Sequence, residues 1–425
     1  MRNISFLIIL SFIFTLQKYP ITNAQHEALA RLWNITDDQI LNFLARENQL
    51  KAADTIVKQQ QQYVNEHTYA GSYIRTTDNI VVFYITPNTP VETILNLPAV
   101  IPIRHLLNFD IAAQNNLSLI SLRYRKGQIY EIAREHNPVL VTIFVDVVLN
   151  NIVVSLYHDY DNVNRDFIND VNQIFDNPPI VFEYKDLAEN EQLNSNASAI
   201  KRRNIQIPLL AGDGFCNLDQ SLTCSLGYFG MRQTATGELE SVFVTSGRCY
   251  RYEIDYYLKP WGPLGIPPPN IYRIGIMDTS NARNRGYDYG ILRIGGEVVL
   301  APSIKNIDSP YHPEIQIWNR NLNPNIHLGI HLCKSGYHTR VNCGYQRSND
   351  ALFFDQIDPY KISYIINIDN NRQDVGGPVF QFLTLSTASS SYFGILTGGI
   401  GNIGLTTRID DIIRLSGVFL VGVGQ

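Results

Sequence analysis

The spacing of apolar residues divides the chain into a mixed first half and a strand-rich second half. From residue 25 to about 65, apolar side chains recur at helical spacing, and a glutamine-rich stretch, 59–62, follows. Runs of β-branched and aromatic residues over 73–85 and 139–156 predict strands, and the segment between them has helical character at 129–135. The first half is therefore predicted to be a small α+β unit.

After residue 205, short apolar runs recur between turns rich in glycine, proline and asparagine, such as 262–270 and 321–325. The predicted strands are 226–232, 241–245, 272–277, 289–294, 362–368, 376–383, 392–398 and 404–408, and a short helix follows at 409–415. Many short strands separated by such turns are typical of an all-β sandwich or barrel. We predict an all-β double β-barrel domain here.

A polar segment, 186–196, and a basic cluster separate the two halves. The cluster consists of Lys201, Arg202 and Arg203. A solvated linker that ends in basic residues is the kind of segment that a furin-like processing protease cleaves, and an ordinary exposed basic patch is the alternative. We place the boundary there, with an α+β domain over 25–203 and the β domain over 204–425.

The first 24 residues predict a cleaved secretory signal. Arg2 precedes an apolar run over 4–16, and small residues surround Ala24, where a signal peptidase would cut. The alternative, a buried N-terminal helix, does not account for these features in this order. No later segment is long enough for a membrane anchor, so we expect a secreted, extracellular protein. Export makes the sequons at Asn34, Asn116 and Asn196 candidate glycosylation sites.

Composition narrows the classes of partner. The chain has 425 residues, of which 45% are hydrophobic, enough for more than one folded core. Its net charge of −5 and the lack of a basic stripe argue against nucleic acid as a partner. Histidines and cysteines do not cluster at metal-ligand spacing, so we predict neither a metal site nor a cofactor.

Six motifs in the second half carry candidate chemistry. They are Cys224 to Tyr228, Val244 to Cys249, Asp288 to Arg293, Cys333 to Gly344, Asp374 to Phe380 and Gly394 to Gly399. In this order they resemble the trypsin/chymotrypsin-fold serine proteases, in particular the bacterial branch of α-lytic protease and streptogrisin. The hairpin between Cys333 and Cys343 is the most specific of the six. The resemblance covers 205–425.

The resemblance implies a role for each position. Asp288 stands at the triad aspartate, Arg248 at the histidine and Val375 at the serine. The segment Thr397, Gly398 and Gly399 corresponds to the strand that pairs with a bound peptide, and Gln373 and Asp374 to the oxyanion region. Disulfides are implied between Cys224 and Cys249 and between Cys333 and Cys343, which leaves Cys216 unpaired. Segments 69–73, 144–147 and 151–154 resemble strands of the family's N-terminal pro-region.

The departures from the family pattern decide the predicted function. The guanidinium of Arg248 has no lone pair with which to accept a proton, and Val375 has no nucleophilic atom. Gln373 replaces a glycine whose positive φ helps to aim an oxyanion donor. We expect Asp288 to persist as a buried acceptor that forms an ion pair with Arg248. His331, His338 and the serine-rich run 386–391 are alternative catalytic groups, but we favour a solvated hairpin and loop as their explanation.

Three hypotheses follow. The first is a secreted pseudoprotease that binds a peptide or protein in the former substrate groove, which its own pro-region could also occupy. The second is an active serine endopeptidase of the same family that uses non-standard catalytic residues. The third is a structural extracellular glycoprotein without a saturable peptide or protein ligand.

Overall fold

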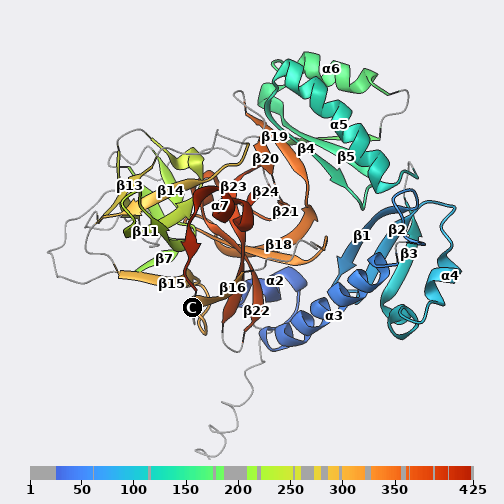
Figure 1. The fold of residues 1–425 in the computed structure, drawn as a ribbon, viewed down its shortest axis with the longest axis horizontal. Coiled ribbons are helices and arrows are strands. Elements are labelled where there is room, and N and C mark those ends of the chain that lie inside the picture. The colour runs from blue at the N-terminus through green and yellow to red at the C-terminus, as the bar shows by residue number, and fades with distance from the viewer. Residues whose placement is uncertain are drawn as a thin grey trace, which may run out of the picture.

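The computed structural model describes residues 25–422, with gaps at 61, 113–115, 176–178, 186–207, 218–221, 252–253, 260–271, 279–285, 296–298, 321–326, 356–359, 363, 386–387 and 401. The predicted signal segment, the sequon at Asn196 and the basic cluster 201–203 lie outside the described residues. We call the described part of 25–185 the N-terminal region and that of 208–422 the β domain. Figure 1 shows the N-terminal region, blue to green, beside the orange and red strands of the β domain.

The N-terminal region consists of two α+β parts. The first contains α2 (Ala28–Trp33), η1 (Asp37–Gln39), α3 (Ile40–Lys58), β1 (Tyr69–Arg75), β2 (Ile80–Ile85), α4 (Val91–Leu95), η2 (Ile101–Leu106) and β3 (Leu107–Ile111). The second contains α5 (Leu119–His136), β4 (Val139–Asp146), β5 (Asn151–Tyr157), η3 (His158–Tyr160), α6 (Arg165–Gln173) and β6 (Ile180–Lys185). The strands β1, β2 and β3 form a three-stranded sheet. The predicted α+β character of this half is confirmed.

Helix α3 shows how the apolar pattern becomes packing. Ile40, Leu44, Leu50, Ala53 and Val57 are buried along one face of the helix. The same face also carries two buried carboxylates, Glu47 and Asp54, seven residues apart. Two turns of an α-helix span about seven residues, so both carboxylates point in the same direction, toward the β domain.

The β domain consists of short strands and one C-terminal helix. The strands are β7 (Pro208–Ala211), β8 (Gly214–Cys216), β9 (Thr223–Ser225), β10 (Phe229–Gln233), β11 (Leu239–Thr245), β12 (Asp255–Lys259), β13 (Arg273–Met277), β14 (Gly290–Ile294), β15 (Val299–Lys305), β16 (Glu314–Arg320), β17 (His331–Gly336), β18 (Arg340–Ser348), β19 (Ala351–Asp355), β20 (Tyr360–Ile362), β21 (Tyr364–Asn367), β22 (Pro378–Thr384), β23 (Ser389–Ile400), β24 (Ile403–Arg408) and β25 (Phe419–Leu420). The helices are η4 (Gly247–Cys249), η6 (Arg372–Asp374) and α7 (Ile409–Ser416).

Two sheets of these strands build the double barrel. In one sheet the order β22-β17-β18-β21-β24-β23 closes on itself, because β22 also pairs with β23, and β16, β15 and β7 extend it. The other sheet has the order β25-β10-β11-β14-β13-β12-β8-β9. Closure removes unpaired edges and encloses a core of side chains from alternate positions, as the burial pattern of β18 shows. The all-β double-barrel prediction is confirmed.

One sheet joins the two halves of the chain. It has the order β20-β19-β4-β5-β6, so β19 of the β domain pairs with β4 of the N-terminal region. The pairing is antiparallel and runs from Ala351 opposite Phe144 to Asp355 opposite Val139. Figure 1 shows β19 and β20 lying beside β4 and β5. The N-terminal region is therefore attached through backbone hydrogen bonds as well as side-chain packing.

None of the described helices is long and apolar enough to cross a membrane. The part of the chain that the structure describes also has no group of three or more histidine, cysteine, aspartate or glutamate side chains that could hold a metal ion.

Candidate functional site

Asp288 is buried and held by the segment that carries Arg248. Its carboxylate accepts hydrogen bonds from the Ser246 hydroxyl and the Gly247 backbone N–H, both at 2.8 Å. The expected ion pair is present, with Nε of Arg248 3.6 Å from Oδ2 of Asp288. Burial raises the pKa of Asp288 above its ordinary value, and Arg248 and these hydrogen bonds offset the rise only in part. The cost of burying the charged carboxylate is thus only partly offset by its partners.

The rest of the Arg248 side chain is engaged by the β domain. Nη2 lies 3.0 Å from Oδ2 of Asp355 at the end of β19. The guanidinium carbon stands 4.7 Å from the centroid of the Phe353 ring, within the range of a cation–π contact. A Cβ built on Gly398 would meet Nη1 of Arg248 at 3.2 Å. Arg248 therefore connects the Asp288 segment to β19, a strand of the sheet that joins the two halves of the chain, and fills space next to the predicted peptide-pairing strand.

Val375 lies between η6 and β22. Its side chain packs against the cluster that contains Cys249, the residue after Arg248, so the structure brings the predicted serine and histidine positions close together. The Val375 carbonyl accepts a hydrogen bond of 2.8 Å from the Ser225 backbone N–H. Gly376 follows with φ of 95°, and a Cβ there would meet Oγ1 of Thr245 at 2.0 Å. Glycine is thus required after Val375 for both conformation and space.

The backbone N–H groups of the predicted oxyanion region donate hydrogen bonds to neighbouring residues of the chain. Arg372–Asp374 forms the short 3-10 helix η6, so Gln373 has helical rather than positive φ. The Gln373 N–H donates to Oδ1 of Asn371 at 3.0 Å, and the Val375 N–H donates to the Arg372 carbonyl at 3.4 Å. An oxyanion hole needs free donors aimed at the substrate, and these two donors have partners within the same turn.

Asp374 is a buried centre of hydrogen bonding. Nζ of Lys334 lies 2.8 Å from Oδ2, and the Thr339 hydroxyl and the Asn371 N–H donate to the same oxygen. The N–H groups of His338 and Thr339 donate to Oδ1. Burial opposes ionisation, but Lys334 and these bonds outweigh it, so the pKa of Asp374 lies below its ordinary value. Asp374 thus fixes η6 against the β17–β18 hairpin.

The predicted peptide-pairing segment lies on β23, next to Arg248. Gly398 and Gly399 pair with Leu405 and Gly404 of β24 on one side, and on the other side no strand of the described chain pairs with them. Tyr157, the last residue of β5, donates from its hydroxyl to the Gly399 carbonyl at 3.0 Å. Burial raises the pKa of Tyr157, and nearby Arg372 and Arg248 oppose the rise. The N-terminal region therefore contacts the predicted peptide-pairing segment.

The implied disulfides are both formed, Cys224 with Cys249 and Cys333 with Cys343. Cys216 is buried and outside both disulfides. The first disulfide ties the Arg248 segment to β9, and the second closes the hairpin that supports Asp374.

The sequons at Asn34 and Asn116 are exposed, which leaves their side chains accessible for glycosylation.

The simple explanation of His331 as part of a solvated hairpin is wrong, because this residue is fully buried in β17. Its Nε2 lies 3.1 Å from the Phe382 backbone nitrogen, and its Nδ1 lies 2.8 Å from Oε2 of Glu47. His338 is partly buried and bonds Asp374 through its backbone. Of the serine-rich run, 389–391 lies in buried strand rather than loop, and 386–387 is outside the described residues.

Three contacts could not be found from the motifs. Lys334 is a buried charged residue of the β17–β18 hairpin, and its burial could be suspected because a buried aspartate needs a counter-charge. Asp355 and Tyr157 come from segments distant in sequence, and their approach to Arg248 and Gly399 depends on the sheet that joins the two halves.

No family model matches the chain, and no curated protein matches it by sequence. Solved structures that resemble it include Protease A from Thermobifida fusca, at 17% identity over 51% of this chain and 100% of that one, with a TM-score of 0.36. A glutamic acid specific serine protease has 18% identity over 50% of this chain and 100% of its own, with a TM-score of 0.38. A chymotrypsin from Cellulomonas bogoriensis has 17% identity over 51% and 100%, with a TM-score of 0.35.

The class of the β domain rests on its own geometry. A closed six-stranded barrel, a second sheet that packs beside it and two disulfides at the implied positions define a chymotrypsin-like double-barrel fold.

Proposed function

We propose that this chain is a secreted, catalytically inactive serine protease homologue that binds a peptide or protein without cleaving it. The observation that carries the proposal is the pair Arg248 and Val375. The guanidinium stays protonated and engaged with Asp288 and Asp355, so it cannot take a proton from a nucleophile. Val375 supplies no nucleophile, and the acyl-transfer mechanism needs both groups as a unit.

The engaged backbone donors support the same proposal. A tetrahedral intermediate carries a negative oxygen that must receive preorganised N–H groups. The N–H groups of Gln373 and Val375 already donate within η6. Electrostatic stabilisation of the transition state is therefore weakened independently of the missing triad groups.

Binding is proposed to occur along the edge of β23. An extended peptide adds to the free edge of a strand through main-chain hydrogen bonds, and no strand of the described chain pairs with Gly398 and Gly399 on that side. In this structure the Tyr157 hydroxyl of the N-terminal region donates a hydrogen bond to the Gly399 carbonyl. The N-terminal region is thus proposed as an internal partner that a peptide or protein ligand must displace at this point.

The extracellular location belongs to the proposal. The signal-like segment 1–24, the two disulfides and the exposed sequons at Asn34 and Asn116 support it.

Affinity selection from a diverse peptide library tests binding. The purified chain is incubated with the library, and retained peptides are identified by mass spectrometry. A Gly398→Leu variant projects a side chain toward Arg248 and is expected to lose the retained peptides. The matched control is Gly127→Leu on α5, where a Cβ would meet nothing within 4 Å. If no peptide is retained, or if both variants retain the same peptides as the natural chain, the proposed groove is wrong.

A further inference from the structure

A cavity of about 390 Å³ lies away from the groove, where three parts of the molecule meet. The end of α3 and β1 form one wall, the start of α5 and β4 a second, and the β18–β19 turn of the β domain a third. The volume is in the range of small-molecule sites. A ligand in this cavity would contact the N-terminal region and the β domain together.

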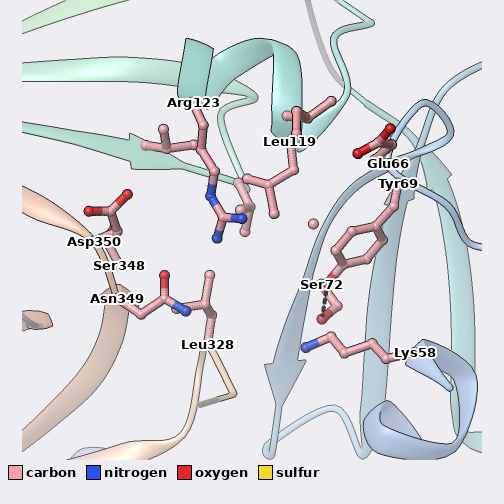
Figure 2. Close-up of a pocket in the computed structure, with 14 residues that line it drawn as sticks. Lys58, Glu66, Tyr69, Ser72, Leu119, Arg123, Leu328, Ser348, Asn349 and Asp350 are labelled. Carbon is pink, nitrogen blue, oxygen red and sulfur yellow. Dashed lines mark hydrogen bonds between the residues drawn. The ribbon is translucent and has the colours of Figure 1, made fainter. Parts of the chain in front are cut away.

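The cationic groups of the cavity point into it. Figure 2 shows the Arg123 guanidinium directed toward its centre, with the Lys58 ammonium and the Asn349 amide facing the same space. Arg123 has no hydrogen bond or ion pair within the described chain, although its charge acts on the nearby Lys126. Leu119 and Ile120, at the N-terminus of the 18-residue helix α5, line the cavity beside it. A partial positive charge at that terminus adds to the charge of Arg123.

The Lys58 wall is held rigid by a buried network. Nζ of Lys58 lies 2.7 Å from Oδ2 of Asp54, and the Ser72 hydroxyl donates to Oδ1 of Asp54 at 2.7 Å. The Tyr69 hydroxyl donates in turn to Oγ of Ser72 at 2.9 Å. Burial alone would lower the pKa of Lys58, but Tyr69 and Asp54 raise it above its ordinary value, so the ammonium stays charged. The polar groups of this wall are preorganised.

The remaining lining sets the class of ligand. Glu66 and Asp350 oppose Lys58 and Arg123 in charge, and Asp350 is itself paired with Lys126. A doubly charged phosphate would meet this acidic rim unfavourably, whereas a single carboxylate matches the planar fork of one guanidinium. Val145, Val147 and Leu328 provide apolar surface next to the charged groups. The cavity thus offers one place for a charge and another for an apolar chain.

We propose that this cavity binds a small organic monocarboxylate, with its carboxylate on Arg123 and its apolar part against the valine and leucine side chains. The proposal is independent of the function proposed for the groove. Because the ligand would contact both halves of the molecule, its binding stabilises their association by mass action.

Isothermal titration calorimetry on the full secreted chain tests the proposal. The probes are acetate, hexanoate, octanoate and 3-phenylpropionate, with hexanamide as a neutral analogue and inorganic phosphate as a different anion. Affinity is expected to rise from acetate to hexanoate, and hexanamide is expected to bind roughly ten-fold more weakly or worse, because it lacks the charge-assisted bond.

Variants on one helix locate the site. Arg123→Gln is expected to weaken hexanoate binding about ten-fold, while Arg134→Gln, an exposed arginine of the same helix paired with Glu131, leaves it unchanged. Both arginines lie at the surface of α5, and circular dichroism melting confirms that each variant folds. The proposal is overturned if no acid binds more tightly than about 10 mM, if the amide binds as well as the acid, if phosphate binds in preference to the acids, or if Arg123→Gln binds hexanoate like the natural chain.

Discussion

Two buried carboxylates of the β domain have opposite environments. Asp374 accepts hydrogen bonds from five donors, including buried Lys334, and its pKa is lowered. Asp288 is equally buried, but its cationic partner stands 3.6 Å away on a partly exposed side chain, and its pKa is raised. Asp374 is therefore a framework group, one that holds neighbouring segments together, whereas Asp288, at the predicted triad aspartate, lacks such a network.

The difference shows which of the two buried carboxylates the fold itself needs. The Asp374 network fixes η6, the β17–β18 hairpin and the wall that carries Val375. At the proposed triad positions, by contrast, Arg248 forms ion pairs with Asp288 and Asp355, and Val375 packs against an apolar cluster. Loss of the framework should unfold the domain, and changes at the triad positions should be tolerated.

The largest effect is expected from breaking the framework pair. Asp374→Asn presents an amide N–H₂ to donors that need an acceptor and leaves Lys334 buried without a counter-charge. Removal of one member of a buried pair costs roughly 3–5 kcal/mol. Lys334→Met should cost a comparable amount. Denaturant unfolding followed by tryptophan fluorescence measures both values, and a loss below about 1 kcal/mol for either variant would refute the framework role.

Low pH should destabilise the protein by protonating buried carboxylates that, like Asp374, have a lowered pKa. Burial opposes the ionisation of Glu47, Asp54 and Asp374, but their partners prevail, and the pKa of each lies below its ordinary value of 4.5, 3.8 and 3.8 respectively. A lowered folded-state pKa gives stability that is present above the unfolded value and is lost as the pH falls through the folded one.

The free energy of unfolding should therefore fall as the pH drops below about 4.5. The raised pKa of Asp288 acts with the opposite sign and reduces the fall. Unfolding titrations between about pH 6 and pH 3 measure the slope. A stability that does not change over this interval would contradict the assigned charges.

Gln373 allows a test of the predicted oxyanion region. In an Arg248→His, Val375→Ser background, weak peptide cleavage is expected if the scaffold is that of a protease. Adding Gln373→Gly frees the segment to adopt positive φ and aim its N–H at the substrate, which should raise the rate on the order of 10²-fold. Hydrolysis of fluorogenic peptides measures the rate, with Gln373→Ala in the same background as the control. Equal rates for glycine and alanine would show that φ at this position is not limiting.

The smallest effect is expected at Asp288. In Asp288→Asn the amide oxygen can accept from the Gly247 N–H and the amide nitrogen can donate to the Ser246 oxygen, so the local hydrogen bonds have replacements. Because the natural carboxylate is under-compensated, we expect a stability change within about 1 kcal/mol at pH 7. Thermal unfolding beside the natural chain measures it. A loss as large as that of Asp374→Asn would remove the distinction between the two sites.

The sequence predicts the fold class, both disulfides and the contact of Arg248 with Asp288, because these depend on local patterns and on motif order. Each of the eight strands predicted in the second half overlaps a strand of the structure. Strands such as β17, with sequence His-Leu-Cys-Lys-Ser-Gly, are missed because buried polar residues interrupt their alternation.

The sheet that joins the two halves is also missed. Its β19–β4 pairing links residues that lie about two hundred positions apart, and no local periodicity reports such a register. For the same reason the contacts of Arg248 with Asp355 and of Tyr157 with Gly399 emerge only from the three-dimensional structure.

The most direct test of the account is mass-spectrometric detection of cleavage in a diverse peptide library by the purified natural protein. An Asp288→Asn variant and the Arg248→His, Val375→Ser double variant are assayed in parallel. The account predicts no cleavage by the natural protein above that of the Asp288→Asn variant. Reproducible cleavage by the natural protein that disappears in Asp288→Asn would contradict the proposal that this chain lacks the serine mechanism.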